Sequence, residues 1–363
     1  MNQKIKLGLS YDDVLLIPQH SEINSREEVD LTTQISPRII LKIPIISINM
    51  TDVTGVEMAI KMGRQGGIGF LPRFVSPEEE ANMVAKVKKA GVRVGAAVGI
   101  RNEGLARAEM LVKAGADIIT LDVAHAAMSR AIEYTRELKR RFGNFIDIVS
   151  GVVATYEGAR DLFKAGADTV RIGVGPGTIC LTRIETGVGV PQITAVAEGA
   201  RAAKKFKKWI LCDGGTKNSG DIVKGLAAGA SAVIIGSQLA GCNESAGRLV
   251  EIEGKMYKEY KASTSLEEKR KHLLSLEGPN KNYLKHIEGV KSFVPLKGPL
   301  ETIIERMVAN IRSGFSYCGA RNIQELWQKA QFIQITPQGL RESGAHDILI
   351  KNDGLIKANF SDS

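Results

Sequence analysis

The stretches KAGADIITLDV (113–123), KAGADTVRIGV (164–174) and AAGASAVIIGS (227–237) repeat one local arrangement along the chain. Each begins with small residues and a glycine of the kind that closes a helix in the left-handed conformation. Each then continues into a run rich in Ile, Val and Leu, as expected of a parallel strand that is buried on both faces. The three stretches therefore predict helices that end at the glycine and lead into buried strands.

Similar apolar runs alternate with amphipathic segments over the first two thirds of the chain. Eight β-then-α units with right-handed crossovers predict a TIM (β/α)8 barrel, and we expect a single catalytic domain over residues 1–363. A doubly wound open sheet is the alternative. The candidate strands are residues 43–49, 67–71, 92–99, 117–123, 145–153, 168–174, 209–214 and 232–237.

The composition excludes several classes of protein. The 363 residues are 44% apolar, which is ordinary for a globular domain, and no apolar run reaches the roughly 18–20 residues of a membrane span. The first residues lack the apolar core of a signal peptide. Four cysteines without paired spacing predict free thiols and a cytoplasmic location.

The net charge of +9 is concentrated in residues 201–209 and 255–272. This charge indicates either a solvated, lysine-rich surface or a field that attracts an anionic ligand such as a nucleotide. No basic-aromatic module of the kind that binds nucleic acids is present, so we do not expect nucleic acid as a partner.

Residues 254–298 are highly charged and poor in strand signal, and they are longer than a normal connection. We expect a mobile flap that covers the active site, because long loops at the C-terminal face of a barrel often act as lids. Plain disorder is the alternative.

The loop after the sixth strand carries Cys180 among Gly173, Gly175 and Gly177. Exposed backbone N–H groups increase the thiolate fraction of a nearby cysteine, which makes Cys180 a candidate nucleophile. The alternative is a small buried hydrophobic residue, which is the usual state of a free cysteine.

Glycines also follow the seventh and eighth strands, where this fold usually binds phosphate. We expect their backbone amides and the Ser237 hydroxyl to hold a phosphate, and Asp213 to bind ribose hydroxyls. After the fourth strand, Asp122 and His125 are candidates for a second ribose, although a structural role for His125 is the stronger interpretation. The glycines are Gly214, Gly215 and Gly236.

Long segments of the chain resemble the IMP dehydrogenase/GMP reductase family. The loop GVGPGTICLTRIETGVGVPQITAV (173–196) looks like the active-site loop of that family, and residues 10–34, 48–69 and 213–241 match other parts of it. The resemblance extends nearly from end to end. The regulatory CBS modules that many members carry are absent, because residues 71–87 continue through their usual position.

The resemblance implies that Cys180 adds to C2 of a purine mononucleotide and that a hydride moves between this carbon and NAD or NADP. It also implies a homotetramer and a possible potassium site. The implied catalytic residues are Cys180, Thr182 and Glu288. The implied substrate residues are Thr178, Asp213, Gly214, Gly215, Gly236, Ser237, Tyr260 and Ser263, and the cofactor residues are Asp122, His125 and Arg171. Potassium would be held by carbonyls of Gly175, Gly177 and Cys180, with Glu342, Ser343 and His346 of a neighbouring subunit.

The sequence departs from the dehydrogenase pattern near the reacting atoms. Asn282 precedes Tyr283 where dehydrogenases have the arginine that activates water, and Ala262-Ser263-Thr264 replaces a Gly-Met-Gly contact to the purine. Val152 replaces an asparagine, and residues 126–128 lack the usual polar side chains.

Three hypotheses about function follow. The first is an IMP dehydrogenase-type enzyme that converts IMP, NAD and water to XMP. The second is a GMP reductase-type enzyme that converts GMP to IMP and ammonia with NADPH, or an enzyme for a diverged purine nucleotide. The third is a nucleotide-binding protein without redox turnover.

Overall fold

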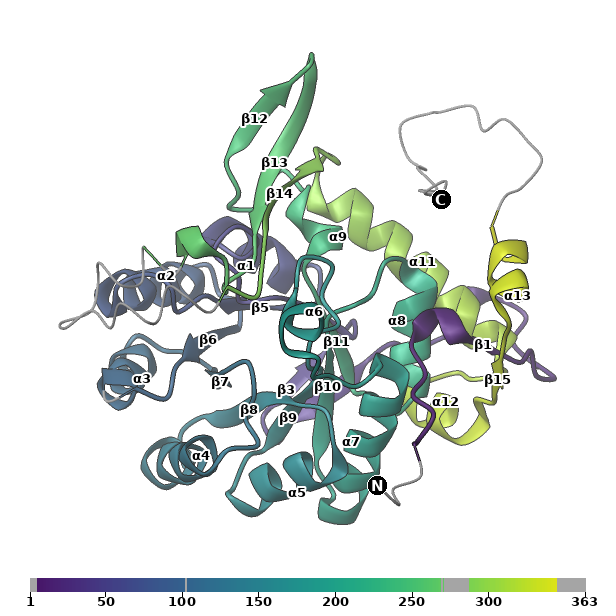
Figure 1. Cartoon of the computed structure of the whole chain (residues 1–363), viewed down its shortest axis with the longest axis horizontal. Coiled ribbons are helices and arrows are strands. Elements are labelled where there is room, and N and C mark those ends of the chain that lie inside the picture. Colours follow the sequence, from purple (N-terminus) through teal and green to yellow (C-terminus); the bar gives the residue numbers. More distant parts are fainter. Residues whose placement is uncertain (1–4, 102, 269, 271–286, 345–363) are drawn as a thin grey trace.

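Eight parallel strands close into a barrel, in the order β4-β5-β6-β7-β8-β9-β10-β11, with β11 pairing back onto β4 (Figure 1). This computed structural model describes residues 5–101, 103–268, 270 and 287–344. All eight predicted strands are confirmed, and the open sheet is excluded. The strands are β4 Ile45–Ser47, β5 Ile68–Leu71, β6 Val94–Val98, β7 Ile118–Asp122, β8 Asp147–Val153, β9 Thr169–Ile172, β10 Trp209–Asp213 and β11 Ala232–Ile235.

The inside of the barrel is filled by large apolar side chains, including the fully buried Phe70 and Ile118. A hairpin of β2 (Thr33–Ser36) and β3 (Ile39–Leu41) contributes Ile35 to the same core. The hairpin packs at the N-terminal end of the strands, because Ile35 accepts a hydrogen bond from the Thr169 hydroxyl at the start of β9. The opposite end, where the strands terminate, is left for a binding site.

The helices cover the outside of the barrel (Figure 1). Gly115, Gly166 and Gly229 have φ of 96°, 106° and 112°, so the left-handed turns predicted from the repeated stretches are present. No domain is inserted between β5, α2 and β6. The helices are α1 Val56–Arg64, α2 Pro77–Lys89, α3 Glu103–Lys113, α4 Ser129–Phe142, α5 Tyr156–Lys164, α6 Thr182–Thr186, α7 Gln192–Phe206, α8 Ser219–Ala227, α9 Ser237–Ala240, α11 Leu300–Tyr317, α12 Ile323–Lys329 and α13 Pro337–Glu342.

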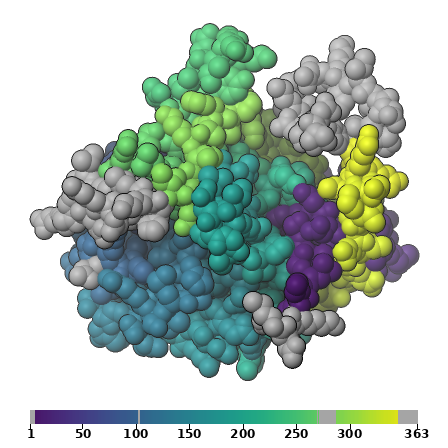
Figure 2. Space-filling view, in the orientation of Figure 1, coloured from purple at the N-terminus to yellow at the C-terminus, as the bar shows by residue number. Residues whose placement is uncertain are grey.

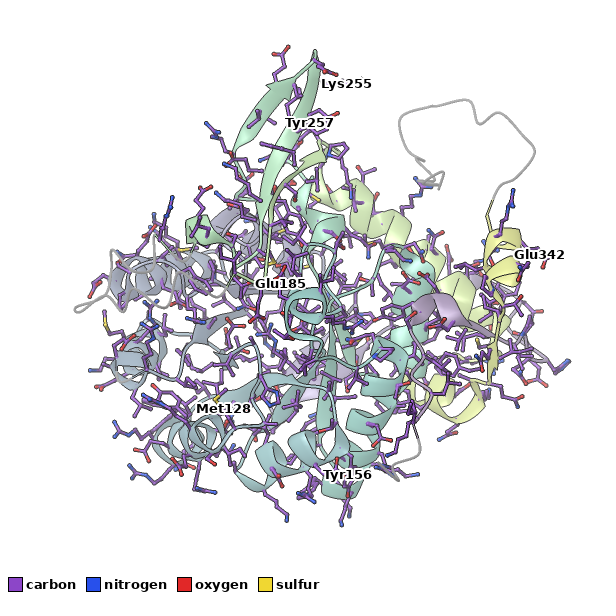
Figure 3. All side chains as sticks on the ribbon, viewed as in Figure 1. Met128, Tyr156, Glu185, Lys255, Tyr257 and Glu342 are labelled. Carbon is purple, nitrogen blue, oxygen red and sulfur yellow. The ribbon has the colours of Figure 1, made fainter. Side chains whose placement is uncertain are left out.

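The segment predicted to be a mobile flap begins and ends in strands, although its sequence has little strand signal, and its role as a lid stays a prediction. β13 (Lys255–Lys261) pairs with β12 (Leu249–Ile252) on one side and with β14 (Lys291–Pro295) on the other. This three-stranded antiparallel sheet projects from the barrel, with Lys255 and Tyr257 toward its tip (Figures 2 and 3). The strands were missed because a projecting sheet needs no continuous apolar run. Residues 271–286, where the rest of the flap was predicted, lie outside the described residues.

The two ends of the described chain meet on the side of the barrel. β1 (Val14–Leu16) pairs antiparallel with β15 (Phe332–Gln334), next to the short helix η1 (Tyr11–Asp13). A second short helix, η2 (Arg26–Glu28), lies between β1 and β2. Among the helices of the described part of the chain, none has the length and apolarity to cross a membrane.

Candidate active site

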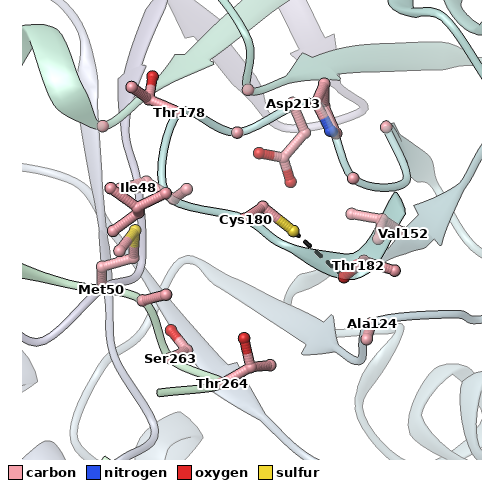
Figure 4. A pocket seen from close by; sticks show the side chains of 18 of the residues that line it. Ile48, Met50, Ala124, Val152, Thr178, Cys180, Thr182, Asp213, Ser263 and Thr264 are labelled. Atoms are coloured by element: carbon pink, nitrogen blue, oxygen red, sulfur yellow. Dashed lines mark hydrogen bonds between the residues drawn. The ribbon is translucent and has the colours of Figure 1, made fainter. Parts of the chain in front are cut away.

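A cleft of about 1070 Å³, including space open to solvent, lies at the C-terminal ends of the barrel strands. Figure 4 shows side chains from both predicted parts of the site facing the same space. The predicted residues that line the cleft are Asp122, Arg171, Gly175, Gly177, Thr178, Cys180, Thr182, Asp213, Gly214, Gly215, Gly236, Ser237, Tyr260 and Ser263.

Cys180 lies in the middle of this cleft and is partly exposed, whereas Cys212, Cys242 and Cys318 are buried. Its backbone N–H donates to the carbonyl of Gly177 at 3.0 Å, which forms a tight turn. The sulfur is therefore presented to the cleft. The alternative of a cysteine packed inward among aliphatic side chains is excluded.

The side chain of Thr182 connects this sulfur to a carboxylate. Its Oγ1 lies 3.2 Å from Sγ of Cys180 and donates a hydrogen bond to Oε2 of Glu288 at 2.7 Å. Thr182 begins α6, directly after the cysteine loop, and Glu288 reaches it from the segment that precedes β14. Sulfur, hydroxyl and carboxylate thus form one hydrogen-bonded chain, which can carry a proton to or from an atom bound near Cys180.

The predicted phosphate end of the cleft contains free backbone donors. The N–H groups of Gly215, Gly236 and Ser237 have no acceptor within the described ranges, whereas the N–H of Gly214 donates to the carbonyl of Ile234 at 3.3 Å. Gly214 is thus not available as an amide donor, because it continues the pairing of β10 with β11. Three free N–H groups on adjacent turns are suited to an anion such as a phosphate.

Two hydroxyls flank these donors. Thr178 donates its hydroxyl to that of Ser237 at 3.3 Å. The buried Tyr260 places its hydroxyl 3.9 Å from the sulfur of Met50, and this hydroxyl would lie 2.9 Å from a Cβ at Gly236. The absence of a side chain at Gly236 therefore leaves room for the tyrosine hydroxyl beside the free amides.

Arg171 lies beneath the cleft, between two carboxylates. It donates from Nε to Asp213 at 2.8 Å and from Nη1 to Asp122 at 3.3 Å, and only 3% of its side chain is exposed. Burial disfavours the charge of Asp122, but the positive charges of Arg171 and Arg73 outweigh burial and lower the pKa of Asp122. Arg171 thus positions the carboxylates, and a direct contact of its guanidinium with the cofactor stays a prediction.

The wall beside Asp122 is apolar. Val123, Ala124 and Val152 line the cleft there, and the side chains of Ala124 and Val152 are drawn in Figure 4. His125 is exposed and does not line the cleft. The predicted contact of Asp122 with a cofactor ribose stays a prediction.

Several lining residues were not singled out from the sequence. Ile48 and Met50 follow β4, and Arg73 and Phe74 follow β5. Their position directly after predicted strands was a usable signal, because strand ends build the site in this fold. The guanidinium of Arg73 stacks 4.3 Å from the ring centroid of Phe74 and donates to Asp122 at 3.1 Å.

The guanidinium of Arg183 lies near the predicted potassium site. Arg183 donates to the carbonyls of Val174 at 3.2 Å and Val190 at 2.6 Å, and its side chain packs against Gly175. The carbonyl of Gly177 accepts the N–H of Cys180. Potassium binding by the carbonyls of Gly175, Gly177 and Cys180 stays a prediction.

The residues predicted to reach this loop from a neighbouring subunit lie elsewhere within one chain. Glu342 ends α13 and Ser343 follows it, and both are exposed. Glu342 lies at the right of the view in Figure 3, away from the sheet that projects at the top. His346 lies outside the described residues. Their contribution from a second subunit stays a prediction.

The barrel and its cleft define an α/β-barrel enzyme that binds an anionic small molecule beside a cysteine. Residues 8–346 match the IMP dehydrogenase / GMP reductase domain, so the chain belongs to this family of NAD(P)-dependent purine-nucleotide oxidoreductases. It is 33% identical to inosine-5'-monophosphate dehydrogenase of Nitrosopumilus maritimus, over 96% of this chain and 100% of that protein. It is 34% identical to GMP reductase of Leishmania donovani, over 94% and 97%.

A solved structure of GMP reductase from Trypanosoma brucei, in complex with guanosine 5'-monophosphate, superposes on this chain with a TM-score of 0.89. The two are 29% identical, and the match covers 95% of this chain and 99% of the other. Dehydrogenases and reductases are thus about equally similar to this chain, and similarity alone does not separate the two activities.

Proposed function

We propose that the chain is an IMP dehydrogenase-type enzyme, in which the Thr182–Glu288 pair replaces the flap arginine as the base. The observation that carries this proposal is the chain of contacts from Cys180 through Thr182 to Glu288, in one cleft with three free backbone donors. Cys180 supplies the nucleophile, and the hydroxyl and carboxylate supply proton transfer.

The donors at Gly215, Gly236 and Ser237 hold the phosphate, and Asp213 accepts hydrogen bonds from the ribose hydroxyls. With the phosphate and ribose held in this way, the purine base lies beside Cys180, and the thiolate of Cys180 forms a bond to C2 of the purine. NAD or NADP, bound against Val123, Ala124 and Val152, supplies the hydride acceptor when present. The oxidised C2 then stays bonded to the sulfur until a water attacks it.

Thr182 and Glu288 act in this second step. Thr182 takes a proton from the attacking water while it passes its own to Glu288, and the bond between C2 and sulfur breaks to return the Cys180 thiolate. The sum is IMP, NAD and water giving XMP, NADH and a proton. Covalent attachment divides one difficult oxidation into two steps with lower barriers.

A GMP reductase-type reaction is the second candidate, and two observations favour it. Arg270 is the only arginine in residues 254–298, so the flap has none beside Tyr283. The same Thr182–Glu288 pair delivers a proton equally well to a departing ammonia, since an acid–base pair works in both directions.

The test is a panel of IMP, GMP and XMP against NAD, NADP and their reduced forms, followed by absorbance of the reduced nicotinamide. NADH formed from IMP supports the dehydrogenase, and NADPH consumed with GMP supports the reductase. Cys180→Ala must abolish either activity while leaving nucleotide binding within about threefold. A protein that binds nucleotide and transfers no hydride in any combination is the third, non-catalytic candidate.

The homotetramer and the potassium dependence predicted from the family belong to this proposal as well. Light scattering after size-exclusion chromatography tests the first. Replacement of potassium by lithium in the assay tests the second: a lower rate supports a potassium site, and an unchanged rate rejects it.

A further inference from the structure

The backbone of residues 288–290 pairs with the loop that carries the nucleophile. The N–H of Leu181 donates to the carbonyl of Glu288 at 2.8 Å, and the N–H of Val290 donates to the carbonyl of Ile179 at 3.3 Å. Cys180 and Gly289 therefore face each other as an isolated antiparallel bridge. The main chain that carries the carboxylate is thus hydrogen-bonded on both sides of the cysteine.

The same segment is also bonded to a third part of the cleft. The carbonyl of Val290 accepts the N–H of Ala262 at 3.0 Å. Ala262 begins a tight turn, closed by a hydrogen bond from the N–H of Ser265 to its carbonyl at 2.9 Å. This turn presents Ser263 and Thr264 to the cleft, across from Cys180 in Figure 4.

Gly289 lies where these segments cross. A Cβ at this position would lie 2.2 Å from Cβ of Ala262 and 2.8 Å from Oγ1 of Thr264. The first contact is far below the distance at which two methyl carbons can pack, so any side chain must push the segments apart. Glycine is required at position 289 because a side chain has no space there. Its backbone conformation is not the reason, since φ of Gly289 lies outside the left-handed range.

We infer that residues 288–290 act as a strap that sets the Glu288 carboxylate against Thr182 and Cys180, and that Gly289 is the positioning residue of this strap. The strap also joins the nucleophile loop to the turn at Ser263 and Thr264. A displacement of that turn by the bound base therefore moves Glu288 relative to Cys180. Catalysis then depends on which base occupies the turn, as well as on how tightly the phosphate is held.

This inference rests on the proposed function only for its kinetic readout. A shift of about 1 Å in a catalytic group lowers the rate on the order of a hundredfold. The phosphate donors lie on other strand ends, so the same shift should leave nucleotide binding nearly unchanged. We therefore expect Gly289→Ala to lower kcat at least about a hundredfold. The Kd for the nucleotide, measured by calorimetry, should change less than about threefold.

A structural defect alone would not explain the two further readouts. The pH profile of kcat should differ in shape from that of the unmodified protein, because the pair that transfers the proton is displaced. The exchange variant Ala262→Gly with Gly289→Ala removes the 2.2 Å conflict and should recover at least about tenfold in kcat. Ala262→Val enlarges the same contact from the turn side and should reproduce the defect, which keeps the test valid if Gly289→Ala does not fold.

Gly339→Ala is the matched control, because a Cβ there meets its neighbours only at 3.4 Å or more and the residue lies in α13. This variant should behave like the unmodified protein. Wild-type kcat and an unchanged pH profile in folded Gly289→Ala would overturn the inference, as would an exchange variant no better than Gly289→Ala.

A second readout needs no turnover. Iodoacetamide labelling of Cys180, followed by mass spectrometry, should be at least about fivefold faster in Gly289→Ala, because the bridge on the cysteine backbone is lost, and the exchange variant should restore the slow rate. If the unmodified protein turns over no nucleotide, the proposed function fails. The labelling rates alone then test whether residues 288–290 hold the loop of Cys180 in place. Equal labelling rates in the unmodified protein and Gly289→Ala would reject the strap.

Discussion

Thr182 donates its hydroxyl to the Glu288 carboxylate at 2.7 Å, although 106 positions separate the two residues in the sequence. The contact joins the first turn of α6 to the segment before β14. In the proposed function, this contact provides the proton path that an arginine provides in other dehydrogenases.

We predict that Glu288→Gln removes this path and leaves hydride transfer intact. The steady-state rate should fall by about 10²–10³, the usual contribution of a positioned acid or base. The first turnover should still release about one NADH per active site with IMP and NAD, because the oxidised base stays on Cys180. Stopped-flow absorbance measures the burst.

Thr182→Val should show the same burst, and the double variant should be no slower than either single variant, since both residues serve one path. Loss of the burst together with the steady-state rate would show that Glu288 acts earlier in the reaction.

Thiol chemistry should be confined to Cys180. Burial raises the pKa of Cys212 to about 11 and that of Cys242 to about 12, and burial also raises the pKa of Cys318. These three thiols are therefore protonated and shielded at pH 8, and the thiolate is the reactive form. Iodoacetamide at pH 8 should label Cys180 at least about a hundredfold faster than the others.

Peptide mass spectrometry over time checks this prediction, and saturating IMP should slow the labelling. Equal labelling of Cys212 or Cys242 in the folded protein would contradict the burial on which the prediction depends.

Replacement of Arg171 should affect stability as well as activity. Arg171→Met leaves the Asp213 carboxylate, which is only 7% exposed, without its cation, whereas Asp122 keeps its ion pair with Arg73. Breaking a buried pair in this way costs about 3–5 kcal/mol in the free energy of unfolding. Urea unfolding followed by circular dichroism measures the loss.

Arg140→Met is the matched control, because Arg140 pairs with Glu137 on the exposed face of α4. Its unfolding midpoint should stay close to that of the unmodified protein. A similar midpoint for Arg171→Met would instead support a role of Arg171 limited to the cofactor.

The projecting sheet should lose stability in acid. Burial tends to raise the pKa of Glu259, but its hydrogen bonds from Arg248 and Lys291 outweigh burial and lower the pKa to about 2. A carboxylate whose pKa is lowered in the folded state stabilises it above the unfolded pKa, near 4.5, and loses this effect as the pH falls toward 2.

The Tm difference between the unmodified protein and Glu259→Gln should thus be largest near pH 7 and shrink below about pH 4.5. Differential scanning calorimetry from pH 7 to pH 3 measures it. A difference that stays constant over this range would show that the charge of Glu259 contributes nothing to folding.

The sequence alone determined the barrel and the end of it that binds ligand. Buried parallel strands need continuous apolar runs, and the glycines at 115, 166 and 229 mark helix ends, so both features are local and readable. The positions of Cys180, Asp213 and Gly215 after such runs then placed them at one rim. The sheet of β12–β14 was not readable, because β12 and β14 are largely exposed and the buried half of β13 contains Lys258, Glu259 and Lys261 in place of apolar residues.

Only the tertiary structure decided how the rim residues are paired. Three features depend on distances between segments far apart in sequence. They are the contacts of Nε and Nη2 of Arg171 with Oδ2 of Asp213, the hydrogen bond from the Gly214 amide to Ile234, and the crossing at Gly289. Local patterns select strands and turns through backbone conformation and burial. Hydrogen bonds between distant segments form only after the barrel has closed, and a sequence pattern contains no record of their geometry.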